Sequence, residues 1–183
     1  MLKAPEPAQG LKARNNASVR NRNKPRRAGS GGNLSRIQFA VGAPSDWQEL
    51  IALVRAYYRF DAIRFKAATV GPALKRLLED ESLGRAWIIR DGVHLAGYAI
   101  LTFNYDVEFG GVEGIVTDLF IHAPYRGLGI GRQVMALIDG YCRLAGIHAL
   151  ELQVEKDNGD AQEFYRRLGF KTLSRLVMSR AVK

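Results

Sequence analysis

Residues 121–132 read IHAPYRGLGIGR, a glycine-rich segment between two apolar ones. Before it lies an apolar run, Gly114–Ile121, which predicts a strand. After it, apolar residues recur at helical spacing from Ile130 to Tyr141, which predicts an amphipathic helix. A strand therefore leads through three closely spaced glycines directly into a helix.

This glycine turn is suited to an anion such as a diphosphate. The first amides of a helix have no partner inside the helix, and the helix dipole places partial positive charge there. Glycines also let the backbone approach a ligand closely. Two familiar phosphate motifs are excluded, because Arg132-Gln133 stands where a P-loop needs Lys-Ser/Thr, and Arg132 stands where the dinucleotide fingerprint needs its third glycine.

Several elements are predicted before the turn. They are a strand over Arg36–Val41, a helix that begins at Ser45 with Gln48 in a possible capping box, a helix around Leu74–Leu78, and two strands, Ala86–Arg90 and Leu95–Phe103. The Asp91-Gly92 pair between those two strands is a strong hairpin signal.

The remaining elements follow the helix behind the turn, which Gly146 is expected to end. They are a strand over Ala149–Val154, a short helix capped by Asp157 or Asn158 and ended by Gly169, and a last strand over Phe170–Met178. This order of elements predicts one mixed α/β sheet with helices packed on it.

Bulk composition limits the class of protein. The chain of 183 residues is 47% apolar, which fits one ordinary globular domain. No run approaches the roughly 18 apolar residues of a membrane-spanning helix, and no secretory signal is recognisable, so a cytoplasmic protein without a membrane segment is expected. A single cysteine, Cys142, excludes a disulfide framework and a cysteine-rich metal site.

Almost all of the net charge of +9 lies in the N-terminal segment. Residues 1–36 carry nine cations and one anion, so residues 37–183 carry 18 cations and 17 anions. Residues 1–35 have too few large apolar side chains to fold and are expected to be a disordered basic tail. A solvated extension is the simplest interpretation, because no aromatic residue is available to stack on bases; weak contact with a polyanion and a transit segment are the alternatives.

A second group of residues joins the glycine turn in a recognisable pattern. Arg126, Gly129 and Gly131 match Arg/Gln-x-x-Gly-x-Gly/Ala, and some thirty residues later come Asn158, Phe164-Tyr165 and Leu168-Gly169-Phe170. In this combination the chain resembles the GNAT family of N-acetyltransferases over roughly residues 36–180. The resemblance implies a GNAT-like domain over residues 36–183, with about four helices flanking a mixed, mostly antiparallel sheet of six to seven strands. The strands at Gly114–Ile121 and Ala149–Val154 are then expected to splay apart.

The resemblance also implies acetyl-coenzyme A as co-substrate, with no metal. Its diphosphate would bind the amides of about Leu128–Arg132, and its pantetheine arm would pair with the backbone of Leu119–Ile121, as an added strand does. The residues expected to bind it are Leu119, Phe120, Ile121, Arg126, Gly127, Leu128, Gly129, Ile130, Gly131, Arg132, Asn158 and Tyr165. For Arg126 an anchoring role in the turn is the alternative to phosphate contact, and for Asn158 an ordinary helix cap.

Transfer of acetyl to an amine needs a base for the ammonium and an acid for the departing thiolate. Tyr165 stands where the family carries its tyrosine acid, although it also fits a helix face that packs in the core. Asp118 is the first candidate for the base, Glu113 the second and Glu108 the third. Since residues five apart in a regular strand point to opposite faces, Asp118 and Glu113 can share a site only if a β-bulge intervenes.

The acceptor is expected to be a primary amine of a small cationic molecule or of a protein, because the carboxylates of Glu108, Glu113 and Asp118 favour a cation. Tyr57, Tyr58, Tyr105, Glu108 and Asp118 are the candidates for contacting it. Tyr57 and Tyr58 cluster with Phe60 and Phe65, for which core packing is the commoner outcome.

The sequence therefore predicts an acetyl-coenzyme A-dependent N-acetyltransferase that acts by direct attack in a ternary complex, as a monomer or homodimer. A non-catalytic acyl-coenzyme A-binding sensor or interaction module is the alternative. Retention of Tyr165 and of the strand carboxylates favours the enzyme.

Overall fold

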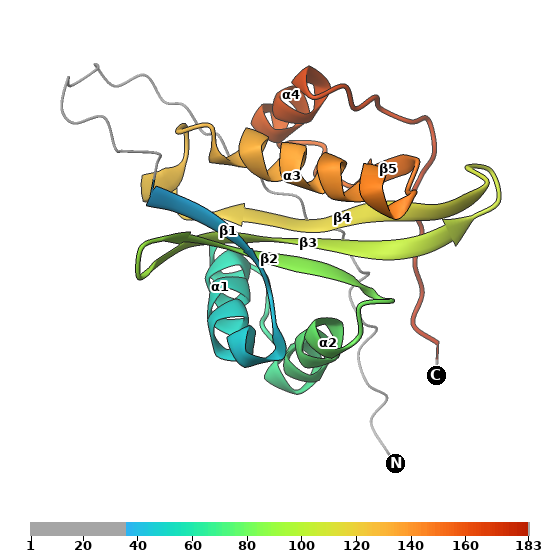
Figure 1. Cartoon of the computed structure of the whole chain (residues 1–183). Coiled ribbons are helices and arrows are strands. Elements are labelled where there is room, and N and C mark those ends of the chain that lie inside the picture. The colour runs from blue at the N-terminus through green and yellow to red at the C-terminus, as the bar shows by residue number, and fades with distance from the viewer. Residues whose placement is uncertain (1–35, 183) are drawn as a thin grey trace, which may run out of the picture.

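Five strands form one sheet in the order of the sequence (Figure 1). The computed structural model describes residues 36–182. The strands are β1 (Ile37–Val41), β2 (Gly84–Asp91), β3 (His94–Asp106), β4 (Gly111–Ile121) and β5 (Ala149–Leu152). Strands β1 to β4 pair antiparallel with one another, and β5 pairs parallel with β4.

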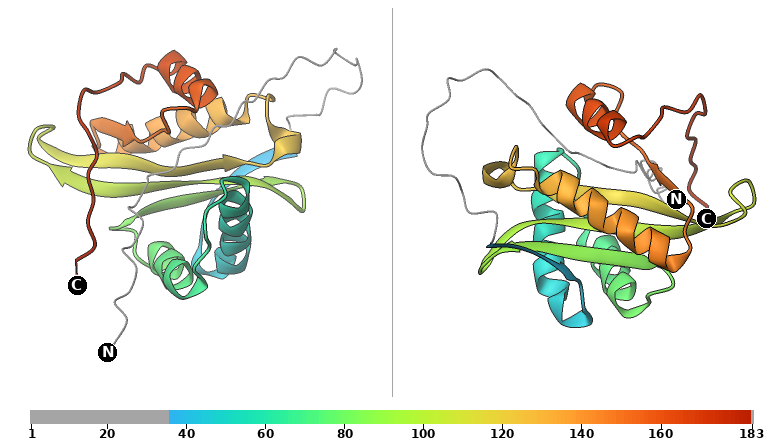
Figure 2. Two further views of the ribbon diagram at one scale, coloured as in Figure 1. Left: turned by 180° about the vertical axis from the view of Figure 1, so that it is seen from behind. Right: turned by 45° about the horizontal axis from the view of Figure 1, so that its top comes forward.

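Two pairs of helices cover the two faces of the sheet. They are α1 (Trp47–Phe60) and α2 (Ala67–Glu79) on one face, and α3 (Ile130–Ala145) and α4 (Gly159–Arg167) on the other (Figures 1 and 2). Two short 3₁₀ helices, Pro44–Asp46 and Ala123–Tyr125, precede α1 and follow β4. The GNAT-like mixed architecture with four helices is confirmed.

Strand β2 shows why the sheet is covered on both faces. Ala86 and Ile88 pack in the core beneath α1 and α2, whereas Trp87 and Ile89 pack in the core beneath α3. Alternate side chains of a strand point to opposite faces, so the continuous apolar run Ala86–Ile89 needs helices on both sides. The hairpin predicted at Asp91-Gly92 is confirmed, with Asp91 paired to His94.

The helix behind the glycine turn begins and ends where the sequence predicts. Its buried side chains include Ile130, Val134 and Ile138, which lie on one face at helical spacing. Gly146, which follows the last residue of α3, has a φ of +69°, a left-handed conformation that ends a helix at low cost only for glycine.

Three predictions are wrong. The sheet has five strands in residues 36–182 where six to seven were expected, because Phe170–Met178 forms no strand. Leu176 and Met178 are 78% and 89% exposed, so this apolar segment does not bury the surface that would stabilise a strand. The capping box predicted at Ser45 and Gln48 does not form; two residues earlier, the Ala43 amide donates to the Asp46 carboxylate at 2.8 Å, which is one half of such a box.

The predicted basic tail, residues 1–35, lies outside the described residues. No helix within residues 36–182 is long and apolar enough to cross a membrane.

Candidate active site

The glycine turn leaves a helix N-terminus open to a ligand. Gly127 and Gly129 have φ of +76° and +79°, and a Cβ added to either would meet no atom within 4 Å. Left-handed backbone favours glycine at both positions, and the space before them is open. The first backbone hydrogen bond of α3 runs from the Gln133 amide to the Gly129 carbonyl. No side chain of the described residues caps this end of the helix. The amides of residues 130–132 are therefore available to an anion.

Gly131 has a different role from the two glycines before it. Its φ is not positive, and an added Cβ would lie 3.2 Å from the tip of the Phe164 ring and 3.6 Å from Ile121. Gly131 thus allows the start of α3 to pack closely against α4 and β4.

Strand β4 has an open edge beyond its middle. It pairs with β5 only from Glu113, opposite Ala149, to Val116, opposite Leu152. Past Val116 the strand keeps its pairing with β3 but has no partner on the β5 side among the described residues. Backbone groups of Leu119–Ile121 at this edge are therefore in position to pair with an extended chain.

A β-bulge lies at the point where the two strands part. Leu101 pairs with Val116 and Ile100 pairs with Asp118, so Thr117 is the extra residue. The bulge reverses the alternation of side chains after it. Glu113 and Asp118 therefore lie on the same face of the sheet, the one that carries α1 and α2, which meets the condition that the sequence set for a shared site.

Asp118 lies among aromatic rings at this bulge. The hydroxyl of Tyr98 donates to Asp118 Oδ2 at 3.2 Å. Tyr98 is fully buried and packs against Tyr57 and Phe120 at ring-centroid distances of 6.5 and 6.2 Å. Burial raises the pKa of Tyr98 well above its usual value, and the Asp118 carboxylate raises it further, so Tyr98 stays a donor.

Glu113 is a buried carboxylic acid with one oxygen left without a partner. Its side chain is 2% exposed, and Asn104 Nδ2 donates to Oε2 at 3.3 Å. Oε1 has no hydrogen-bond partner among the described residues. Burial raises the pKa of Glu113; the Asn104 amide lowers it, and the carboxylates of Glu151 and Asp106 raise it further.

Tyr165 presents a buried hydroxyl without a partner. The residue is 2% exposed, and its oxygen makes no hydrogen bond among the described residues. Its ring makes edge contacts with Phe164 and Phe170 and belongs to the core that contains Val116 of β4. Burial raises the pKa of Tyr165 far above the ordinary value, so it carries its proton at every physiological pH.

Arg126 turns back from the glycine turn toward α1. Its Nε donates to the carbonyl of Ile121 at 2.7 Å, and its guanidinium lies 4.3 Å from the ring centroid of Phe60. Partial burial lowers the pKa of Arg126. This geometry favours the anchoring role over a direct phosphate contact.

The other candidates are distributed as follows. Asn158 caps α4, accepting the Ala161 amide at 3.1 Å, as a plain N-cap does. Tyr57 is fully buried and belongs to the core, Tyr58 is half-buried against Phe65, and Tyr105 is 71% exposed on the β3–β4 hairpin. Glu108, on the same hairpin, forms an ion pair with Arg175. Of these, only Glu108 lies on the surface with a charge suited to an amine.

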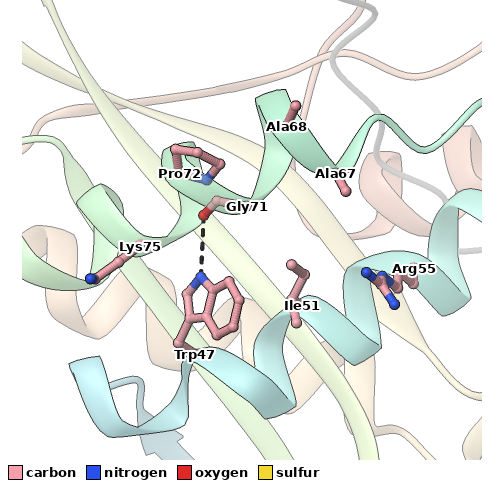
Figure 3. Close-up of a pocket in the computed structure, with 8 residues that line it drawn as sticks. All are labelled: Trp47, Ile51, Arg55, Ala67, Ala68, Gly71, Pro72 and Lys75. Atoms are coloured by element: carbon pink, nitrogen blue, oxygen red, sulfur yellow. Dashed lines mark hydrogen bonds between the residues drawn. The ribbon is translucent and has the colours of Figure 1, made fainter.

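Two surface pockets lie away from these residues. The larger, about 370 Å³, lies between α1 and α2, where Trp47 Nε1 donates to the carbonyl of Gly71 at 3.2 Å (Figure 3). The other, about 270 Å³, lies between the end of α3 and β5. Neither is lined by the glycine turn, the open edge of β4 or Tyr165. In the described part of the chain, no group of three or more His, Cys, Asp or Glu side chains could hold a metal ion.

Comparison with known proteins agrees with this geometry. The model of the acetyltransferase (GNAT) family matches residues 47–170, about two thirds of the chain. The chain belongs to the GNAT family. It is 35% identical over 68 residues to the uncharacterized N-acetyltransferase YycN of Bacillus subtilis, a match that spans 37% of this chain and only 43% of that relative.

Two solved structures illustrate the likeness of fold to this GNAT protein. An integron cassette protein from the mobile metagenome of Cole Harbour Salt Marsh is 26% identical, with 83% of this chain and 93% of that chain covered and a TM-score of 0.71. A predicted acetyltransferase of Clostridium acetobutylicum, solved with acetyl-CoA, is 16% identical, with coverage of 79% and 96% and a TM-score of 0.67.

Sequence reasoning missed three residues near the candidate site. Tyr98, which hydrogen-bonds Asp118, follows from the pairing of β3 with β4 and has no local signal. Glu151 and Arg175 come near Glu113 and Glu108 only through folding of the C-terminal third of the chain. The alternation of Leu150, Glu151 and Leu152 within the strand was the available hint that Glu151 faces away from the core beneath α3.

Proposed function

We propose that this GNAT protein is an acetyl-coenzyme A-dependent N-acetyltransferase that acetylates a primary amine by direct attack in a ternary complex. The observation that carries the proposal is the buried hydroxyl of Tyr165, which has no hydrogen-bond partner within residues 36–182 and belongs to the same core as the bulged part of β4. A buried hydroxyl without a partner costs free energy, so a ligand atom that accepts its hydrogen bond is the simplest reason for its presence.

The carrier fits the open backbone groups of the turn and of β4. The diphosphate oxygens would accept hydrogen bonds from the backbone amides at the start of α3, where left-handed Gly127 and Gly129 leave room for them. The pantetheine arm would pair with the open edge of Leu119–Ile121. The thioester would then lie at the bulge, where β4 and β5 part.

The acid and the base would approach this point from opposite faces of the sheet. Tyr165 belongs to the core beneath α3, and Asp118 contacts Tyr98 of the core beneath α1. We assign Asp118 as the base ahead of Glu113, because Asp118 lies at the open part of β4 and Glu113 lies where β4 and β5 are still paired. The amine would therefore enter from the α1 side.

The reaction then proceeds with a simple balance of protons. Asp118, directly or through water, takes one proton from the ammonium. The neutral amine attacks the thioester carbonyl carbon, and an amide of β4 at the bulge stabilises the oxyanion. The C–S bond breaks as the tetrahedral intermediate collapses, and the Tyr165 hydroxyl gives its proton to the departing thiolate. The acetylated nitrogen loses its second proton through water, which restores the Tyr165 hydroxyl, and Asp118 releases the first proton to solvent.

The test uses the full chain with acetyl-coenzyme A. Calorimetry measures binding of the carrier, and a thiol-release assay measures turnover over a panel of mono-, di- and polyamines, aminoglycosides and lysine peptides. Saturable thiol release that depends on the amine, with a matching mass gain of one acetyl group on that amine, supports the enzyme. Tight carrier binding without turnover of any amine contradicts the enzyme and supports the sensor module.

A further inference from the structure

Four carboxylates gather on one corner of the face that carries α1 and α2. Asp106 ends β3, Glu108 lies in the following turn, Glu113 is on β4 and Glu151 is on β5. Glu113 pairs with Asn104 and with Ala149, so Asp106 and Glu151, each two residues further along, are its diagonal neighbours on the same face. The Asp106 and Glu151 carboxylates both act on Glu113 electrostatically.

The centre of this acidic corner is a polar atom without a partner. Glu113 is only 2% exposed, and its Oε1 accepts no hydrogen bond from any described residue. Burying such an oxygen costs free energy unless a donor meets it. Glu113, whose pKa is raised, can share its proton with the facing carboxylate of Glu151. An ammonium group from outside the cluster would supply donors in place of that proton.

The chain itself already places one cation over this corner. Arg175 donates to both oxygens of Glu108 at 2.8 and 2.7 Å, and the carboxylates of Asp106 and Glu151 act on it as well. Arg175 belongs to the segment after α4, which runs from the α3–α4 side of the sheet to the α1–α2 side (Figures 1 and 2). The Arg175 and Glu108 side chains are 65% and 56% exposed, so solvent weakens their pairing.

We propose that this corner is a subsite for a second cation of the acceptor, and that Arg175 occupies it while no acceptor is bound. The inference rests on the proposed function. Asp118 follows Glu113 by five residues, but the bulge residue Thr117 adds no length to the strand. Four residues at about 3.3 Å each place the corner about 13 Å along β4 from Asp118. The preferred acceptor is therefore a linear di- or polyamine whose ammonium groups span about this distance, one reacting at Asp118 and one held by the corner.

The experiment compares linear diamines of graded length, spermidine and spermine with monoamines of equal length, using thiol release by the full chain. We expect kcat/KM to be at least tenfold higher for the amine of matching span than for its monoamine. Glu151→Gln and Glu108→Gln should move this ratio toward one. Arg175→Gln should lower KM for the matching amine by up to about fivefold, the limit for competition by an exposed ion pair.

The matched control is Arg167→Gln, which removes an arginine of similar exposure from the exposed pair with Glu163 on α4 and should leave the ratio unchanged. Equal use of mono- and diamines, or an equal effect of Arg167→Gln, overturns the subsite but leaves the acetyltransferase intact. If no amine is acetylated, calorimetric titration with spermine decides: binding weakened by Glu151→Gln and tightened by Arg175→Gln supports the subsite, and binding insensitive to both overturns it.

Discussion

Replacing Tyr165 by phenylalanine removes one oxygen atom and keeps the ring. The ring contacts with Phe164 and Phe170, at centroid distances of 5.0 and 5.6 Å, need not change. The hydroxyl has no hydrogen-bond partner in the part of the chain that the structure describes, and leaving a buried hydroxyl unsatisfied costs about 1–3 kcal/mol. The variant should therefore be more stable by about 1 kcal/mol, which raises Tm by roughly 2–4 °C for a chain of this size.

The same change should slow the reaction. A positioned general acid or base contributes about 10²–10⁴-fold, and a thiolate is a good leaving group, so we expect kcat to fall by about 10²-fold. The affinity for acetyl-coenzyme A should change little. Differential scanning fluorimetry, calorimetry and thiol release measure the three quantities. An unchanged kcat removes Tyr165 from the mechanism, and a clear loss of stability shows that the hydroxyl has a partner in the free protein.

Three further changes test other parts of the site. Asp118→Asn keeps an acceptor for the Tyr98 hydroxyl but removes the base, so kcat should fall by about 10²-fold without loss of the fold; a full rate shifts the role to Glu113. The raised pKa of Glu113 means that the folded state favours its protonated form, so the contribution of Glu113 to stability is full below about pH 4.5 and is lost as pH rises through the folded pKa. In urea unfolding, the free energy of unfolding of Glu113→Gln should equal that of the wild type at pH 4 and exceed it by about 1 kcal/mol at pH 8. Equal stability of the two proteins at both pH values refutes this. Arg126→Ala removes the bond to the Ile121 carbonyl and the stacking on Phe60, so stability should fall by about 1 kcal/mol with little change in affinity for acetyl-coenzyme A, whereas a tenfold loss of affinity would make Arg126 a phosphate ligand.

The parts of the molecule that could be predicted from the sequence are those with local causes. The left-handed conformation of Gly129 and Gly146 brackets α3, and each follows from what glycine alone tolerates. The Asn158 cap likewise depends on atoms within three residues. Features of this kind can be predicted from a few neighbouring residues, without knowledge of the fold.

The parts that could not be predicted depend on partners distant in the sequence. No residue near Thr117 indicates a bulge, which arises from a shift in the register of β3 and β4 between Ile100 and Leu101. The segment Phe170–Met178 is rich in apolar residues, yet a strand also needs a neighbour to pair with, and β5 offers only four residues. Tyr98 and Arg175 reach their carboxylates across 20 and 67 residues of sequence.

In the proposed mechanism the backbone amides at the start of α3 bind the diphosphate of the carrier. The most direct measurement is the calorimetric affinity for acetyl-coenzyme A of Gly129→Ala beside Gly146→Ala, since both glycines are left-handed, face open space and flank the same helix. Alanine disfavours the left-handed backbone by about 1–2 kcal/mol, and the turn at Gly129 has to hold this backbone to bind the carrier, whereas the end of the helix at Gly146 does not. We therefore predict a 5- to 30-fold loss of affinity for Gly129→Ala and none for Gly146→Ala. Equal affinity in both variants would contradict the claim.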